Sequence, residues 1–131
     1  MSVKIMEWSQ SANGTGCLFA DNEHQTIFDF VNQTGSAVES GNQAKVADLL
    51  EDTIDYTVQH FSSEERMMER KGYDAQKLKN HKASHAKFIG SLRDLQAAKR
   101  DVTLDDLKGA AAWFIAHINN EDKDYEGAIN G

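Results

Sequence analysis

Five histidines and two acidic residues have the types and spacing of a metal site. His81 and His85 are four residues apart, and so are His60 and Glu64, so each pair would lie on one face of a helix, one turn apart. Paired imidazoles and carboxylates in this arrangement can hold a metal ion between helices. The complete candidate set is His24, His60, Glu64, His81, His85, His117 and Asp122.

The last pair of the set has a different spacing. His117 and Asp122 are five residues apart, and a straight α-helix turns two such side chains about 140° away from each other. Both residues can therefore serve one site only if the helix widens locally, or if the carboxylate reaches across to a second metal. We regard this spacing as an indication of two metals.

Four helices are expected to position these residues. Apolar residues recur at helical spacing in four stretches, and the chain contains no proline to interrupt them. Gly41 and Gly72 fall where helices would end, whereas Gly35, Gly90 and Gly109 would weaken the helices that contain them. The first expected helix covers about 22–39 after an N-cap at Asp21, and the second runs from beyond Gly41 to Gly72. The third begins after an N-cap at Asp74 and continues through Leu95. The fourth begins at a capping box of Thr103 and Asp106 and continues through Ile118.

Short connections make neighbouring helices antiparallel, which predicts an all-α, up-down-up-down four-helix bundle. The length of 131 residues suits one domain, residues 1–131, with an N-terminal arm over 1–20 and the bundle from about 21 to 126. With a rise of about 1.5 Å per residue, all seven candidates fall in a slab about 10 Å thick. A single histidine on an apolar face is most often a hydrogen-bonded core residue, but five at one level are costly to bury, and a metal site explains them.

The donor set predicts two metals rather than one. Cys17 is the only cysteine, so a cysteine-based zinc site, an iron-sulfur cluster and an internal disulfide are excluded. Five imidazoles and two carboxylates are too many for tetrahedral zinc, and this many neutral nitrogen ligands does not suit Mg²⁺ or Ca²⁺. If both carboxylates and one oxygen atom bridge two metals, three histidines complete the six-coordinate shell of one metal. The other two histidines give the second metal five ligands, which leaves it with one open position.

Charge excludes several classes of partner. The net charge of −7 repels phosphate backbones, so nucleic-acid binding and adsorption to an anionic membrane are not expected. No stretch approaches the ~20 apolar residues that cross a bilayer. The opening residues MSVKIMEWSQ lack the apolar core of a signal peptide, which predicts a cytoplasmic location.

The sequence resembles the hemerythrin family, specifically single-domain bacterial hemerythrins, over essentially its whole length. The matching segments are Trp8, GCLFADNEH (16–24), YTVQHFSSEE (56–65), HKASH (81–85) and WFIAHINNEDKDY (113–125). The resemblance implies two iron ions per chain with an oxo or hydroxo bridge. It also implies that His81, His85 and His117 bind the saturated iron, that His24 and His60 bind the iron with the open position, and that Glu64 and Asp122 bridge the two.

The family's function implied here is reversible O₂ binding, for storage, delivery or sensing, with no enzymatic role. The resemblance places Phe61, Trp113, Phe114 and Ile118 around the O₂ pocket. Phe114 stands where the family often has leucine, so its larger ring would narrow access to the open iron; the alternative is that Phe114 only packs in the core. Cys17 is expected to pack as a small apolar residue.

Other functions remain open at this point. A di-iron oxidase or peroxidase could use the same centre, and the domain could be an oxygen-sensing or redox-sensing module. A zinc hydrolase is disfavoured because HKASH has Lys82 where the HExxH motif needs its glutamate. Besides O₂, the only partner to consider is an oxygen-consuming protein of unknown identity, and a monomer is expected.

Overall fold

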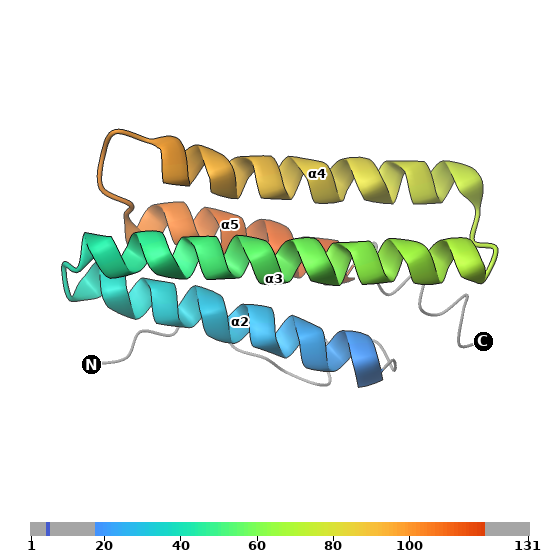
Figure 1. The fold of residues 1–131 in the computed structure, drawn as a ribbon, viewed down its shortest axis with the longest axis horizontal. Helices are drawn as coiled ribbons and strands as arrows, with labels where there is room; N and C mark the ends of the chain where they lie inside the picture. The colour runs from blue at the N-terminus through green and yellow to red at the C-terminus, as the bar shows by residue number, and fades with distance from the viewer. Residues whose placement is uncertain (1–4, 6–17, 120–131) are drawn as a thin grey trace.

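Four helices form the part of the chain that the structure, a computed structural model, describes: residue 5 and residues 18–119 (Figure 1). They pack antiparallel in the order up, down, up, down, which confirms the predicted four-helix bundle. The predicted N-terminal arm lies almost entirely outside the described residues. The helices are α2 (Leu18–Glu39), α3 (Gln43–Arg70), α4 (Ala75–Ala97) and α5 (Leu104–His117).

Two of the predicted helix starts are confirmed. The Asp74 side chain accepts a hydrogen bond from the backbone N–H of Lys77 at 2.9 Å and caps α4. Thr103 and Asp106 form the expected capping box at α5: each side chain accepts from the other's backbone N–H, at 3.2 and 2.9 Å. These bonds satisfy amide groups that the first turn of a helix leaves unpaired.

The predicted start of the first helix is wrong. Asp21 is not an N-cap, because α2 begins at Leu18 and Asp21 lies buried in its first turn. The preceding residues, Leu18, Phe19 and Ala20, include no helix breaker, so the helix extends past the residue with the highest capping preference. The cap of α3 was not predicted: Asn42 accepts from Lys45 N–H at 3.1 Å.

Both glycines expected between helices lie in tight turns. Gly41 has φ of 76° and Gly72 has φ of 73°, a left-handed conformation that glycine adopts without strain. These turns reverse the chain between α2 and α3 and between α3 and α4. The three other glycines considered above, at 35, 90 and 109, lie inside helices.

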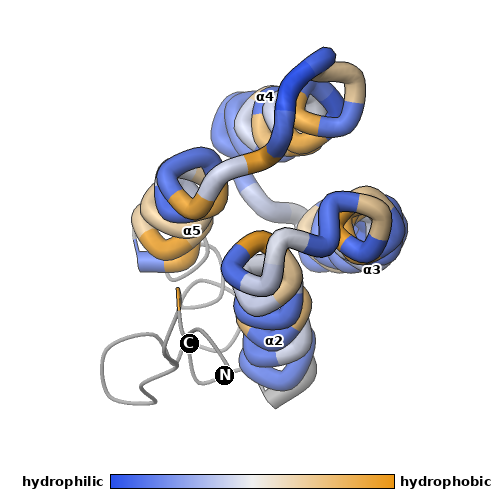
Figure 2. Tube along the Cα trace, turned by 90° about the vertical axis from the view of Figure 1, so that its left-hand side faces the viewer, coloured by the Kyte–Doolittle hydropathy of each residue, from blue (hydrophilic) through white to orange (hydrophobic). Residues whose placement is uncertain are grey.

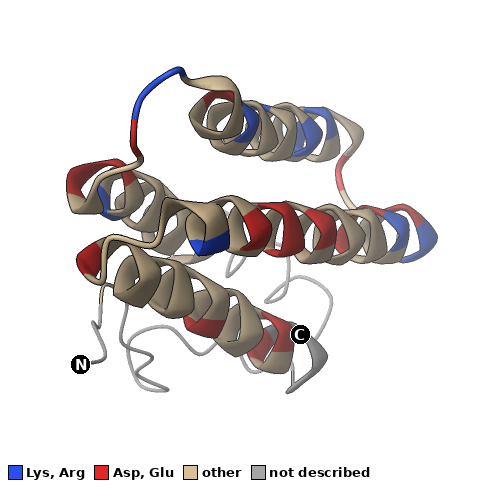
Figure 3. Ribbon diagram, turned by 60° about the vertical axis from the view of Figure 1, so that its left-hand side comes forward, with Lys and Arg blue, Asp and Glu red and all other residues tan. Residues whose placement is uncertain are grey.

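Buried apolar residues of all four helices form the core. Hydrophobic and hydrophilic positions are interspersed along the helices (Figure 2), and charged residues occur on all four of them (Figure 3). The main apolar cluster joins Ile27 and Phe28 of α2 to residues of the other three helices. A second cluster lies toward the α2–α3 turn, and a small one of Met68, Leu78 and Tyr73 lies at the α3–α4 turn. Along α3, Glu64 lies between Phe61 of the main cluster and Met68 of the small one, and His60 directly precedes Phe61. None of the described helices is both long and apolar enough to cross a bilayer.

The connection from α4 to α5 is fastened to the start of α3. The Gln43 side chain donates to the Val102 carbonyl at 3.1 Å and accepts from the Val102 N–H at 3.0 Å. Val102 is buried in the second apolar cluster. This contact sets where α5 begins relative to the rest of the bundle, and so it contributes to the height of His117.

Candidate metal centre

Six of the seven predicted metal ligands meet in the interior of the bundle. Each helix supplies at least one of them, and each of the six is buried. Between the histidine rings, the centroid distances are 4.8 Å for His24 and His60, 4.4 Å for His81 and His85, and 4.7 Å for His81 and His117. The seventh residue, Asp122, lies outside the described residues.

The six residues divide into two groups that share one carboxylate. The donor atoms of each group lie within 4.8 Å of one another. One group combines Glu64 of α3 with histidines of α4 and α5, and the other combines it with histidines of α2 and α3. The groups are Glu64 with His81, His85 and His117, and Glu64 with His24 and His60.

The two oxygens of Glu64 face different groups. Oε1 lies 3.4 Å from Nε2 of His85, whereas Oε2 lies 3.4 Å from Nε2 of His60 and 3.6 Å from Nε2 of His24. The Glu64 side chain is fully buried. A carboxylate that points one oxygen at each of two clusters of nitrogen donors has the arrangement of a bridge between two metal ions.

The spacing of the nitrogen atoms fits metal coordination. Nε2 of His85 lies 3.1 Å from Nε2 of His117. Two imidazoles at right angles on one metal ion, with bonds of about 2.1 Å, would place their nitrogens about 3 Å apart. Two further facts fit. The ligand atoms are nitrogen and oxygen only, and burial lowers the pKa of His85, although the hydrogen bond that the ring donates to Glu65 opposes this shift. Burial thus favours the neutral imidazole that a metal needs.

The backbone widens directly after His117. Residues 118 and 119 form a π-helical turn. Such a turn is the local widening that the spacing from His117 to Asp122 requires, because it advances the chain by more residues per turn than an α-helix. Asp122 lies outside the described residues, so its place in the site stays a prediction.

Two glutamates that the sequence did not single out contact the site from outside. Glu23 Oε1 lies 2.7 Å from Nδ1 of His60, and Glu65 Oε2 lies 2.8 Å from Nδ1 of His85. Each stands next to a predicted ligand in the sequence, His24 or Glu64. Adjacent residues on a helix point about 100° apart, so a residue next to a ligand in the sequence lies on a different face of the helix. Its position in the sequence therefore does not predict that it contacts a histidine of the next helix.

Aromatic rings pack against the histidines. The Phe61 ring lies between both groups, stacked on His85 and 5.8 Å from His60 between centroids. Phe114 meets His24 edge-on, with centroids 5.7 Å apart, and is almost fully buried. Trp113 stacks on His117 with centroids 4.8 Å apart. Ile118, the fourth predicted pocket residue, is fully buried in the main apolar cluster, which also contains Phe61 and Phe114.

Comparison with known proteins identifies the relatives of this chain. The family model described as the hemerythrin HHE cation binding domain matches residues 19–129. The chain belongs to the hemerythrin family. The bacteriohemerythrin of Methylococcus capsulatus is 38% identical to it, over 94% of this chain and 95% of that protein. The myohemerythrin of Riftia pachyptila is 32% identical, over 83% of this chain and 82% of that protein.

Solved hemerythrins share the whole fold. The crystal structure of a wild-type hemerythrin superposes with a TM-score of 0.89 at 37% identity, covering 96% of this chain and 98% of the other. A leucine-to-phenylalanine variant superposes with a TM-score of 0.90 at 37% identity, covering 98% and 100%.

Membership in the hemerythrin family indicates the activity of this chain. Hemerythrins are oxygen-binding proteins that hold a di-iron centre, and they are not enzymes. The histidine and glutamate cluster of this hemerythrin is suited to that centre. This chain therefore binds O₂ at a non-heme di-iron site inside a four-helix bundle, as the resemblance of its sequence predicted.

Proposed function

We propose that this hemerythrin binds O₂ reversibly with the following division of its ligands. His81, His85 and His117 hold the saturated iron, and His24 and His60 hold the iron with an open position. Glu64 and Asp122 bridge the pair, together with an oxo or hydroxo group. When bound, the irons supply the electrons and the open position that O₂ binding needs.

One observation carries this assignment: the separation of the Glu64 oxygens. Oε1 faces His85, and Oε2 faces His60 and His24. The two donor groups that share Glu64 contain three histidines and two, the unequal numbers that leave one metal with a vacancy. The π-helical geometry at 118–119 supports the inclusion of Asp122, because π-helical winding brings side chains five residues apart closer to one face than α-helical winding does.

The same chain provides the walls that protect bound O₂. Phe114 lies edge-on to His24, one of the two histidines assigned to the open iron, and its ring also contacts Phe28 and Phe88. Together with Phe61 and Ile118 it forms the apolar wall of the proposed O₂ pocket, which excludes water and anions. Trp113, through its stack on His117, would flank the saturated iron.

We further infer a cytoplasmic monomer. Among the described residues, Val58 is the one large apolar side chain that is exposed, at 38%. The described part of the surface, with so little exposed apolar area, offers no large patch for permanent association with a second copy. Whether the O₂ is stored, delivered to an oxygen-consuming protein or sensed depends on a partner outside this chain.

The test combines metal analysis with oxygen cycling. The anaerobic ferrous protein is expected to contain two irons, gain visible charge-transfer bands in air and lose them when O₂ is removed, over several cycles. Irreversible conversion to the ferric form in the first cycle would contradict reversible binding.

The ligand assignment needs a variant of its own. His117→Ala is expected to lower the bound iron well below two per chain, with Glu69→Ala as a control, because the exposed Glu69 pairs with Lys82 outside the cluster. Helix content measured by circular dichroism separates a lost ligand from a lost fold. Two irons and an unchanged spectrum in His117→Ala would disprove the assignment.

A further inference from the structure

We propose that Glu23 and Glu65 are positioning residues, one for each iron, which determine the nitrogen that His60 and His85 present to the metal. The inference rests on the ligand assignment proposed above and goes beyond it to residues that touch no metal. Each glutamate contacts a histidine of the next helix along the chain: Glu23 of α2 reaches α3, and Glu65 of α3 reaches α4.

The direction of the hydrogen bond follows from the chemistry of the partners. An ionised carboxylate only accepts hydrogen bonds, so the nitrogen that faces it must carry the proton. The facing atom is Nδ1 in both histidines, at 2.7 Å from Glu23 and 2.8 Å from Glu65. In a neutral imidazole the lone pair then lies on Nε2. This is the nitrogen that lies 3.4 Å from a Glu64 oxygen in both His60 and His85.

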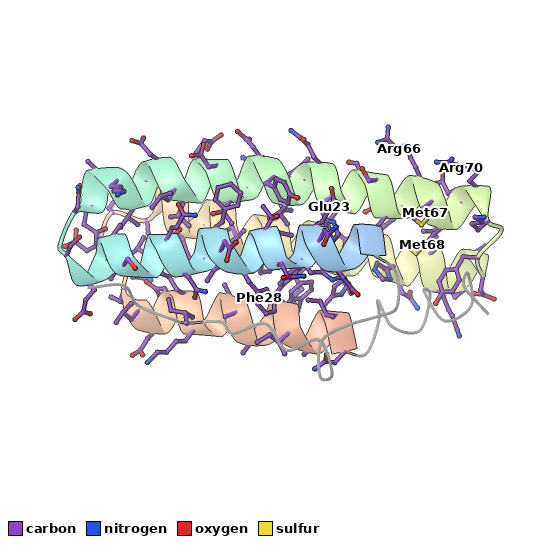
Figure 4. The ribbon with its side chains drawn as sticks, turned by 90° about the horizontal axis from the view of Figure 1, so that it is seen from below. Glu23, Phe28, Arg66, Met67, Met68 and Arg70 are labelled. Carbon is purple, nitrogen blue, oxygen red and sulfur yellow. The ribbon has the colours of Figure 1, made fainter. Side chains whose placement is uncertain are left out.

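The two contacts have the same burial pattern. The histidine side chains are 0% and 3% exposed, whereas Glu23 and Glu65 are 25% and 24% exposed. Each carboxylate thus stays partly hydrated while it holds a buried ring, which avoids the cost of burying a second charge beside Glu64. Figure 4 shows Glu23 on α2 at the side that faces α3.

Other contacts leave the rings little freedom to rotate. The Phe61 ring covers one face of His85, so Glu65 and Phe61 fix two different directions of the same imidazole. Such outer contacts orient ligands and raise their basicity, and their removal typically weakens metal binding by about 10-fold to 100-fold. A negative carboxylate behind the ring also favours the ferric state, in which the metal carries more positive charge.

The first experiment examines the apoprotein, so that its result does not depend on iron or O₂. In protein labelled with ¹⁵N at histidine, long-range ¹H–¹⁵N spectra distinguish the two tautomers. We expect His60 and His85 to carry the proton on Nδ1. In Glu65→Gln the amide oxygen still accepts this hydrogen bond, so His85 should keep its tautomer. In Glu65→Ala, His85 should become a mixture, and His60 should be unchanged.

The second experiment measures iron. Glu65→Ala is expected to weaken iron binding by about 10-fold to 100-fold, and Glu65→Gln by less. Glu65→Gln should nevertheless raise the reduction potential of the centre, because the charge is lost while the hydrogen bond remains. Glu23→Ala and Glu23→Gln should behave in the same way through His60. Glu69→Ala, one turn from Glu65 on the same helix, is the matched control and should change neither quantity.

The outcomes separate this inference from the proposed function. A wild-type apoprotein in which His60 and His85 carry a proton on Nε2 and none on Nδ1, or a Glu65→Ala variant with unchanged tautomer and iron affinity, would overturn the positioning role. If instead the tautomers are as expected but the wild-type chain fails to hold two irons, the ligand assignment fails and the positioning of the rings stands.

Discussion

Phe61 and His85 stack face to face: their ring centroids are 3.6 Å apart and their planes differ by 2°. The two residues come from adjacent helices, α3 and α4, so the stack joins the apolar cluster directly to a proposed iron ligand. Phe61 precedes the bridging candidate Glu64 by three residues. One turn of α3 therefore supplies both the aromatic ring that packs on His85 and the carboxylate proposed to bridge the two irons.

Phe61→Leu should allow the His85 ring to move more freely while the bundle stays folded. Loss of the ring contact costs about 1 kcal/mol, and His85 gains rotational freedom, so we expect faster loss of iron to a chelator. Phe88→Leu is the matched control, because Phe88 is buried in the same cluster but stacks on Trp113. Equal rates of iron loss in the two variants would assign the effect to core stability and not to His85.

Phe114→Ala should speed autoxidation of the oxygenated protein. The ring lies against His24, and its removal opens a path for water and anions to the proposed open iron. Because Phe to Ala in a core costs about 3–5 kcal/mol, the rate is best measured at low temperature, with Phe114→Leu as a milder variant. The decay of the visible bands in air gives the rate, and an unchanged or slower decay would contradict the gating role.

Removal of iron should lower the thermal stability of the chain. The buried Glu64 carboxylate and five imidazoles are grouped to bind cations, so the folded state binds iron better than the unfolded one. At a free metal concentration 100 times the dissociation constant, such linkage is worth about 2.7 kcal/mol. Calorimetry with and without a chelator measures the shift in Tm, and the shift should grow with iron concentration. Identical Tm values would indicate that the cluster does not bind iron in the folded state.

The capping box of α5 should make stability depend on acidic pH. The hydrogen bonds from Arg100, followed by the hydrogen bond from the Thr103 backbone, lower the pKa of Asp106 from 3.8 to about 2. A carboxyl group whose pKa is lower in the folded state stabilises the fold above its unfolded pKa and loses this contribution as the pH falls toward 2. Asp106→Ala should therefore cost about 1 kcal/mol at neutral pH and progressively less between about pH 4 and pH 2.

Urea unfolding of both proteins at several pH values gives this difference, and taking the difference removes the protonation of the metal ligands that both share. Asp105→Ala, at an exposed position of the same turn, is the control. If the difference in free energy of unfolding between the wild type and Asp106→Ala stays constant down to pH 2, the ionised carboxyl group does not have this role.

Gly109→Ala should stabilise the protein by roughly 0.5–1 kcal/mol, because glycine in a helix interior costs conformational entropy. A Cβ atom built at Gly109 meets nothing within 4 Å, so no repacking is needed. Gly41→Ala is the opposite control: its site is equally open, but its φ of 76° is strained for alanine and should cost about 1–2 kcal/mol. Thermal unfolding of the two variants should therefore shift in opposite directions.

Helical periodicity and spacing were sufficient to predict the bundle and the residues that its interior brings together. His60 with Glu64 and His81 with His85 share a helix face because four residues make only slightly more than one turn, a property of any α-helix. The caps at Asp74 and Thr103 were predictable for the same reason, since capping is a contact between residues two or three apart. Asp21 shows the limit of such local preference, because the helix continued through it.

Contacts between helices depend on the rotation and height of each helix, which no single segment encodes. The division of the Glu64 oxygens between His85 and the pair His24 and His60 arises only when the four helices meet. The same is true of Glu23 and Glu65, which bind histidines 37 and 20 residues away. The sequence by itself thus determined the bundle and the types of donor atom, because both follow from short-range periodicity and side-chain chemistry. The tertiary structure decided which atoms face one another, because that depends on packing between segments far apart in the chain.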